Sequence, residues 1–143
     1  MEVRYSIRAP RDRVFRAWTD PEELKQWWGP GEFTTPVAQI DLRPGGSYLL
    51  VMQPGHGDAL RVVGTYRQIE PPSRLVYTWR WDTPWSDGSE SIVTVDFIGR
   101  GQETEVVVLH EGFGPEGEDP YRQGWEGGLQ KLAASIGKGV THG

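Results

Sequence analysis

The chain has 143 residues, a formal net charge of -5 and no cysteine. This length fits one domain that buries about two thirds of its unfolded surface without metal or disulfide cross-links. The absence of cysteine excludes disulfide scaffolds, thiol nucleophiles and cysteine-ligated zinc, and the scattered basic residues form no stripe for a phosphate backbone.

The same features set our expectations for organisation and location. The amino terminus is not typical of a signal peptide, and no apolar run approaches the roughly 18 residues of a membrane span. We therefore expect a cytoplasmic protein with no membrane insertion and no nucleic-acid partner. We expect a single domain at residues 1–138, followed by a short tail at 139–143.

The amino-terminal part predicts one strand and two short helices. Residues 2–8 alternate polar and apolar side chains, the period of a strand with one solvated face. Ala9-Pro10 opens a first short helix, and Asp20-Pro21-Glu22-Glu23 opens a second one with a capping-box arrangement. We expect the second helix to end at Gly29-Pro30 with Trp27-Trp28 in its last turn, and both helices to brace the sheet.

The middle of the chain predicts six further strands separated by turns rich in Gly and Pro. The strands are placed near 34–42, 47–53, 61–69, 75–82, 91–98 and 103–111. Because consecutive strands are joined by short turns, they are expected to form an antiparallel meander.

Alternation along these strands predicts which side chains face the concave side. That set comprises Tyr48, Leu50, Met52, Tyr66, Tyr77, Trp79, Trp81, Val93, Val95, Phe97, Val106, Val108 and His110. The opposite set, expected in water, includes Thr78, Arg80, Asp82, Thr94, Asp96 and Glu105. Four apolar residues, Leu49, Val51, Val107 and Leu109, break the pattern on the outer face. Either the short helices or the second subunit of a homodimer would cover them.

The last long segment, 119–136, predicts an amphipathic helix. Its apolar stripe consists of Tyr121, Trp125, Leu129, Leu132, Ala133 and Ile136. Asp119 is the expected N-cap, Pro120 the first helical residue and Gly137 the stop. A helix of about 16 residues and a strand of about seven have similar lengths, so a curved sheet can wrap around this helix.

Three glycines inside this helix are unusual, because each costs about 1 kcal/mol relative to alanine. They are Gly124, Gly127 and Gly128, of which the first and third flank the apolar stripe. Two explanations remain open: close packing of the helix against a strand, or a helix wall cut back to leave room for a ligand.

His110 is the one histidine on the predicted concave face, at the end of a strand near the start of the last helix. It is a candidate general base or polar anchor, and the alternative is a structural histidine. His56 in a Gly-rich turn and His142 in the tail share no ligand spacing with a second residue. We therefore expect no metal and no cofactor.

The aromatic residues give the strongest indication of function. Tyr48, Tyr66, Tyr77, Trp79, Trp81 and Trp125 gather on the predicted inner face. Each hydroxyl and indole N–H needs a partner when buried, so the set indicates either a filled core with a polar network or the lining of a pocket.

Several ordered motifs together resemble one known family. They are Arg13-Val14-Phe15, Trp18-Thr19-Asp20-Pro21, Trp27-Trp28-Gly29-Pro30, Ile40-Asp41-Leu42-Arg43-Pro44-Gly45-Gly46, Ile69-Glu70-Pro71-Pro72-Ser73-Arg74-Leu75, Thr78-Trp79 and Gly124-Trp125. Over nearly the whole chain they resemble the SRPBCC superfamily (START, ring-hydroxylase, polyketide-cyclase and pollen-allergen-like), in the branch of homologues of the heat-shock-protein-ninety ATPase activator. The resemblance implies an α+β helix-grip fold: a curved seven-stranded antiparallel sheet around a long C-terminal helix, two short helices after the first strand, and a cavity between sheet and helix.

From these features we predict a binding protein for a small apolar or aromatic ligand, rather than an enzyme. The predicted ligand-binding residues are Tyr48, Met52, Tyr66, Tyr77, Trp79, Trp81, Val93, Val108, His110, Tyr121, Gly124, Trp125 and Gly128. One alternative is a cyclase-type enzyme in which His110 and a tyrosine move protons on a bound polyketone. Another is a co-chaperone-like module that activates an ATPase through protein contacts.

Overall fold

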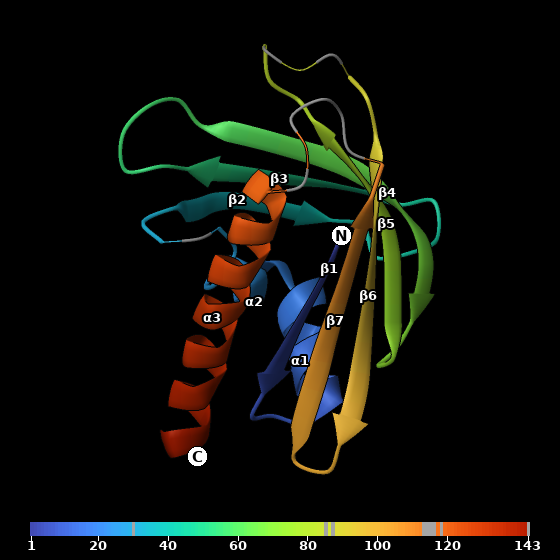
Figure 1. The fold of residues 1–143 in the computed structure, drawn as a ribbon, viewed down its shortest axis with the longest axis vertical. Helices are drawn as coiled ribbons and strands as arrows, with labels where there is room; N and C mark the ends of the chain where they lie inside the picture. Colours follow the sequence, from blue (N-terminus) through green and yellow to red (C-terminus); the bar gives the residue numbers. More distant parts are fainter. Residues whose placement is uncertain (30, 85, 87, 113–116, 118, 143) are drawn as a thin grey trace.

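The described part of the chain folds as one strongly curved antiparallel sheet with helices on its concave face (Figure 1). The computed structural model describes residues 1–29, 31–84, 86, 88–112, 117 and 119–142, with side chains described through Ile136. The helices are α1 (Arg11–Thr19), α2 (Pro21–Leu24) and α3 (Asp119–His142). The strands are β1 (Glu2–Ile7), β2 (Thr34–Ile40), β3 (Ser47–Gln53), β4 (Leu60–Glu70), β5 (Arg74–Trp81), β6 (Ser91–Arg100) and β7 (Glu103–Glu111).

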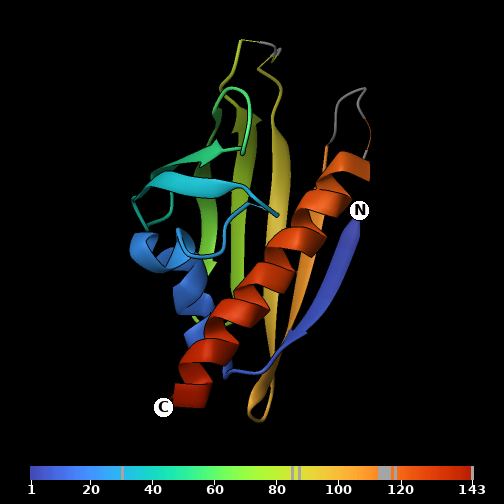
Figure 2. The ribbon, with the colours of Figure 1, turned by 90° about the vertical axis from the view of Figure 1, so that its left-hand side faces the viewer.

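The strand order follows directly from the short connections. Within the described residues the sheet has seven strands in the order β1-β7-β6-β5-β4-β3-β2, and every neighbouring pair is antiparallel. Strands β2 to β7 form the predicted meander, and β1 joins the far edge beside β7. Figure 2 shows α3 crossing the concave face of this sheet. The predicted helix-grip fold is therefore confirmed.

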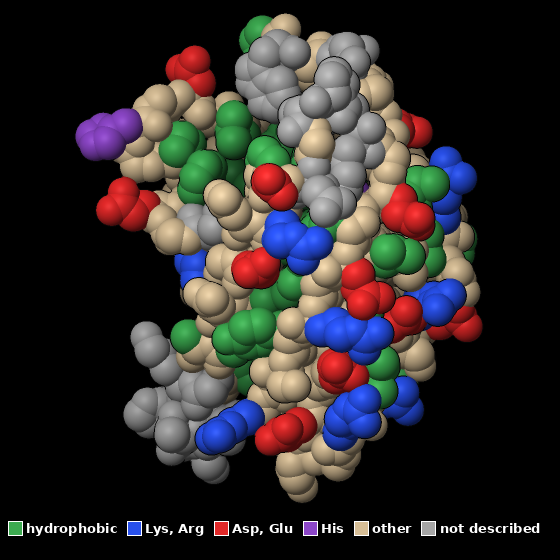
Figure 3. All heavy atoms as spheres, viewed as in Figure 1, with side chains coloured by type: hydrophobic (Ala, Val, Ile, Leu, Met, Phe, Trp, Pro, Cys, Tyr) green, Lys and Arg blue, Asp and Glu red, His purple; other side chains and the backbone are tan. Residues whose placement is uncertain are grey.

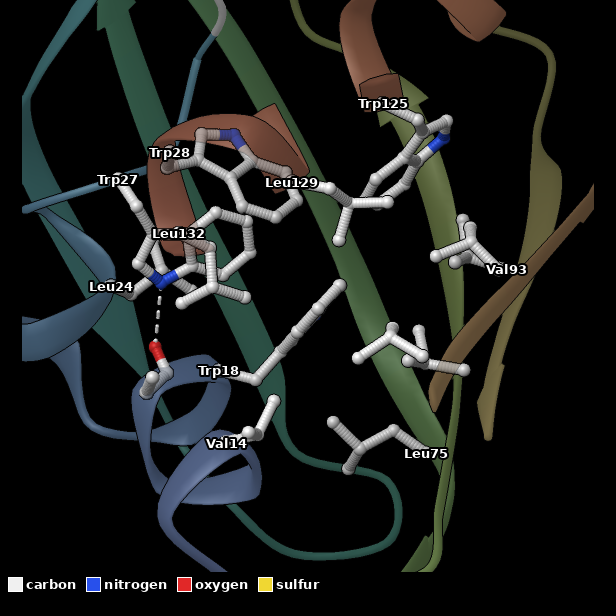
Figure 4. Close-up of a cluster of buried hydrophobic side chains, with 14 of the residues drawn as sticks. Val14, Trp18, Leu24, Trp27, Trp28, Leu75, Val93, Trp125, Leu129 and Leu132 are labelled. Carbon is white, nitrogen blue, oxygen red and sulfur yellow. Dashed lines mark hydrogen bonds between the residues drawn. The ribbon is translucent and has the colours of Figure 1, made fainter. Parts of the chain in front are cut away.

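The predicted concave face forms the core. All of its predicted members are buried except Trp81, which is half-buried. Figure 4 shows how Trp125, Leu129 and Leu132 of α3 point toward Trp18 and the two tryptophans that follow α2. The sheet and α3 bury their apolar faces against each other, which is the main source of stability for such a layered domain.

The short helices lie on this same concave side. Phe15 and Trp18 of α1 pack edge-on against Phe97 of β6, with ring centroids 5.3 and 5.6 Å apart. The suggestion that these helices cover Val107 and Leu109 is therefore wrong, because those two residues belong to the opposite face. Val107 is nevertheless buried within this chain, and for Leu49, Val51 and Leu109, which are half-buried, cover by a second subunit remains a prediction.

Thr78 was predicted to lie in water, but it is buried. Its Oγ1 accepts a hydrogen bond from the Thr65 N–H at 2.9 Å, and its carbonyl accepts one from the Tyr48 hydroxyl at 2.6 Å. Tyr48 reaches this carbonyl across Gly64. A Cβ on Gly64 would lie 2.0 Å from the Thr78 carbonyl oxygen and 2.7 Å from the Tyr48 ring, so only glycine fits there.

The second short helix is much shorter than predicted. Asp20 does cap it, accepting from the N–H groups of Glu22 and Glu23, but α2 ends at Leu24 and the tryptophan pair lies in the turn beyond. The Glu23 carboxylate binds Arg13 and Arg16 of α1 and does not complete the capping box. Pro30, the predicted helix end, lies outside the described residues.

The last helix is longer than predicted. It begins at Asp119 itself, which is therefore the first helical residue and not the N-cap, and it continues to His142. The predicted stop at Gly137 is wrong. Glycine permits a helix to end but does not force it to, because its cost in a helix is only about 1 kcal/mol.

Charged side chains of both signs intersperse over the face of the molecule formed by β1, β7 and β6 (Figure 3). They form exposed ion pairs such as Arg74–Asp96 at 2.7 Å and Arg100–Glu105 at 2.8 Å. Exposed pairs contribute about 0 to 1 kcal/mol each, so they add little to the stability of the core.

None of the helices in the described ranges has the length and apolar character that crossing a membrane requires.

Candidate ligand pocket

An apolar pocket of about 490 Å³ lies between the first turns of α3, the end of β5 and the loop that joins α2 to β2. It is lined by Trp27, Trp28, Gly29, Phe33, Met52, Leu60, Trp79, Trp81, Pro120, Tyr121, Gln123, Gly124, Trp125 and Gly128. None of these side chains is charged. The volume lies within the range of about 300 to 1,000 Å³ that is typical of small-molecule sites. Figure 3 shows hydrophobic side chains gathered beside the start of α3, toward the β3–β4 hairpin.

Helical spacing brings one wall of the pocket together. Tyr121, Gly124, Trp125 and Gly128 recur at intervals of three and four residues, so they share one face of α3. A Cβ placed on Gly124 would have no heavy atom within 4 Å, and one on Gly128 would meet only the Trp27 ring at 4.0 Å. Of the two explanations for these glycines, the geometry matches a helix wall cut back beside open space.

The loop between α2 and β2 forms the facing wall. Gly29 adopts a left-handed conformation with φ of 91°, which few other residues tolerate, and this turns the chain so that Trp28 and Phe33 both line the pocket. Lys131 of α3 then holds the loop. Its Nζ donates to the carbonyls of Gly29 at 2.8 Å and Phe33 at 2.7 Å, and partial burial lowers the pKa of this ammonium. Periodicity along α3 could not have predicted this contact, because its two acceptors are backbone carbonyls of a distant loop.

The structure divides the predicted site residues into two groups. Seven of them line the pocket: Met52, Trp79, Trp81, Tyr121, Gly124, Trp125 and Gly128. The other six, Tyr48, Tyr66, Tyr77, Val93, Val108 and His110, are buried elsewhere in the core.

The three tyrosines form a cluster of their own beside Trp18. Their ring centroids lie 5.5 to 5.9 Å apart, and the Tyr77 hydroxyl accepts a hydrogen bond from the Trp18 indole at 3.2 Å. Burial raises the pKa of each of these phenols. The inner void that all three line together with Trp18 is only about 10 Å³, too small for an organic ligand. These tyrosines therefore fill the core.

Seven lining residues were not predicted: Trp27, Trp28, Gly29, Phe33, Leu60, Pro120 and Gln123. Most of them belong to the loop after α2 or to the ends of elements, where the periodicity of strands and helices gives no direction for a side chain. The sequence feature that could have indicated this wall is the pair Trp27-Trp28 followed by Gly29, with Phe33 four residues beyond the glycine.

His110 is fully buried behind the pocket wall and joins α3 to the sheet. The Trp125 indole N–H donates to its Nδ1 at 3.1 Å, and its Nε2 lies 2.7 Å from the Ser91 hydroxyl. An indole nitrogen can only donate, so Nδ1 is the acceptor and the neutral ring carries its proton on Nε2. Burial, together with the positive charge of the chain amino terminus, lowers the pKa of His110 from 6.5 to about 3.

This arrangement suits a structural role better than acid–base chemistry. The only basic lone pair of His110 is occupied by Trp125, and its Nε2–H points at Ser91, so the ring cannot take a proton from that hydroxyl. The Ser91–His110 pair is therefore not an activated nucleophile. Within the described ranges, no group of three or more His, Asp or Glu side chains could hold a metal ion.

The curved sheet that grips a long C-terminal helix, with an apolar pocket beside that helix, defines a protein of the helix-grip class. A family model described as "Activator of Hsp90 ATPase homolog 1-like protein" matches residues 8–137. The chain belongs to this family.

Individual relatives differ in how much of their own length this chain covers. The human activator of 90 kDa heat shock protein ATPase homolog 1 is 30% identical over 112 residues, which cover 76% of this chain but 31% of the human protein. A solved structure from Chromobacterium violaceum is 28% identical with a TM-score of 0.88 and 95% coverage of both chains. The AHSA1 protein from Silicibacter pomeroyi is 27% identical with a TM-score of 0.80, covering 96% of this chain and 98% of its own.

Proposed function

We propose that this protein binds a small, largely apolar or aromatic ligand in the pocket beside α3. The observation that carries the proposal is the open space at Gly124, in a pocket lined by aromatic rings and free of charged side chains. A glycine that costs helix stability without relieving any close contact needs another explanation, and room for a ligand supplies one.

The alternatives have less support. A cyclase would need His110 as an acid or base, but its ring is held by Trp125 and Ser91. Activation of a heat-shock ATPase is the second candidate, and the 30% sequence identity to the human activator favours it. The matched region is 31% of the length of the human protein. ATPase stimulation by the purified protein, unchanged in a variant with a blocked pocket, would support that candidate.

Gly124→Leu is expected to abolish ligand binding while the protein remains folded, because the added side chain projects into open space. Native mass spectrometry of the freshly purified protein should show a bound small molecule in the wild type and none in this variant. Titration with the neutral fluorophore N-phenyl-1-naphthylamine should show the same loss. Gln130→Leu, at an exposed position of the same helix outside the pocket, is the matched control. Equal binding by wild type and Gly124→Leu would rule out this pocket as the site.

Gly124→Ala is expected to raise the free energy of unfolding by up to about 1 kcal/mol, because alanine is the better helix former and its methyl meets no neighbour. Gly64→Ala is the contrasting control: its methyl would overlap the Thr78 carbonyl, and destabilisation of about 1 to 3 kcal/mol is expected. Denaturant midpoints measure both. Destabilisation by Gly124→Ala would mean that α3 is closely packed there and that the space is not open.

A further inference from the structure

Trp79 of the pocket wall carries a buried polar atom that lacks a hydrogen-bond partner among the described residues. The indole nitrogen of Trp79 is buried and makes no hydrogen bond within the described part of the chain. Buried indole N–H groups nearly always have an acceptor, and those of Trp18, Trp27, Trp81 and Trp125 do, in Tyr77, Ala17, Tyr121 and His110. The Trp79 N–H is therefore an unsatisfied donor on a residue that lines an otherwise apolar site.

The surroundings of Trp79 define what could satisfy this donor. Its ring packs against Trp28, Trp81 and Trp125, with centroids 5.9, 5.4 and 5.8 Å away, and all four rings line the pocket. Such walls favour a flat aromatic ligand. Trp81 and Tyr121, whose rings lie next to the Trp79 ring, are only half-buried, so this part of the pocket wall is nearer to solvent than the core behind it.

The absence of charge in the lining restricts the ligand further. A carboxylate that entered the pocket would lose its hydration without meeting a cationic side chain, and an ammonium group has no lone pair to accept the Trp79 hydrogen bond. A neutral acceptor has a smaller desolvation cost and matches the unsatisfied Trp79 donor.

We infer that the ligand is a neutral aromatic molecule with a carbonyl-type oxygen, an aryl ketone or quinone, which accepts a hydrogen bond from the Trp79 Nε1–H. This inference rests on the proposed binding function and names the chemical class of its ligand. Trp79 is then the residue that determines specificity, while the surrounding rings supply shape.

Matched tricyclic probes test this inference. Fluorene and 9-fluorenone have nearly the same shape and differ in a CH₂ group against a C=O group; fluorene-2-carboxylate and 9-fluorenyltrimethylammonium add a negative and a positive charge. Quenching of tryptophan fluorescence at neutral pH should give an affinity for fluorenone about tenfold higher than for fluorene, the effect of one good hydrogen bond. Both charged probes should bind more weakly than fluorenone.

Trp79→Phe keeps an aromatic ring but removes the N–H. It should lower the ratio of fluorenone affinity to fluorene affinity from about ten to about one, because neither probe then meets an N–H donor at this position. Trp81→Phe is the matched control, because the Trp81 N–H is already bonded to the Tyr121 hydroxyl. Whatever this change does to either affinity, the preference for fluorenone over fluorene should remain. Infrared spectroscopy adds a test on the wild type that does not depend on the variants folding. The C=O stretching band of bound fluorenone should lie at a lower wavenumber than that of fluorenone in a solvent without hydrogen-bond donors.

The outcomes separate the two proposals. Equal affinities of the wild type for fluorene and fluorenone, or an unshifted carbonyl band, would overturn the role of Trp79. The proposal that the pocket binds a small apolar ligand would be unaffected. Tightest binding of a charged probe would overturn the neutral class. If neither the probes nor N-phenyl-1-naphthylamine bind, the proposed function itself fails.

Discussion

Trp125→Ala is expected to lower the free energy of unfolding by about 3 to 5 kcal/mol, a large share of the 5 to 15 kcal/mol that domains typically have. Trp125 is 6% exposed and lies where α3 contacts α1, the loop after α2 and strand β5. Its ring stacks on Trp18 with centroids 6.0 Å apart and packs edge-on against Trp28 at 5.4 Å. The substitution also removes the hydrogen bond to the buried His110.

Urea denaturation of Trp125→Ala beside Trp81→Ala measures this effect. Both changes remove an indole from the pocket wall, but Trp81 is only half-buried, so its loss should cost clearly less. If Trp125→Ala unfolded at nearly the wild-type midpoint, the contact between α3 and the short helices would not be the core of this domain.

His110 is expected to make folding stability depend on pH on the acid side. Its pKa is about 3 in the folded protein against 6.5 ordinarily, so between these values the unfolded chain binds the proton and the folded chain does not. Stability should therefore fall as pH drops from 6.5 toward 3, by up to about 1.4 kcal/mol per pH unit, and this contribution should be constant above 6.5. Protonation also costs the bond from Trp125, because a charged imidazole has no acceptor nitrogen.

His110→Gln should remove this acid-side slope while changing stability at neutral pH only slightly. A glutamine can still accept from Trp125 through its oxygen and donate to Ser91 through its amide, but it does not titrate. His56→Gln, at an exposed turn position, is the control and should leave the slope in place. NMR titration of the His110 imidazole measures its folded-state pKa and so tests whether this residue causes the slope. A folded-state pKa above 6.5 would contradict this account of the site.

The sequence by itself determined the elements and the faces they bury. Side chains alternate across a strand and recur every three to four residues in a helix, so Trp79 and Val93 could be assigned to the inner face and Trp125 to the buried stripe of α3 without any knowledge of their partners. The order of the motifs then indicated the helix-grip fold. These inferences depend on local geometry, which each segment carries in its own residues.

Only the tertiary structure decided which buried residues line a pocket and which fill the core. Tyr77 and Trp79 have the same parity on β5, yet Trp18 occupies the space beside the first and the pocket lies beside the second. Gly64 in β4 and Gly124 in α3 both lie inside a regular element, but a Cβ would meet a carbonyl oxygen 2.0 Å away at the first and open space at the second. Such differences depend on contacts between residues distant in the chain, and periodicity along one segment contains no information about what packs against it.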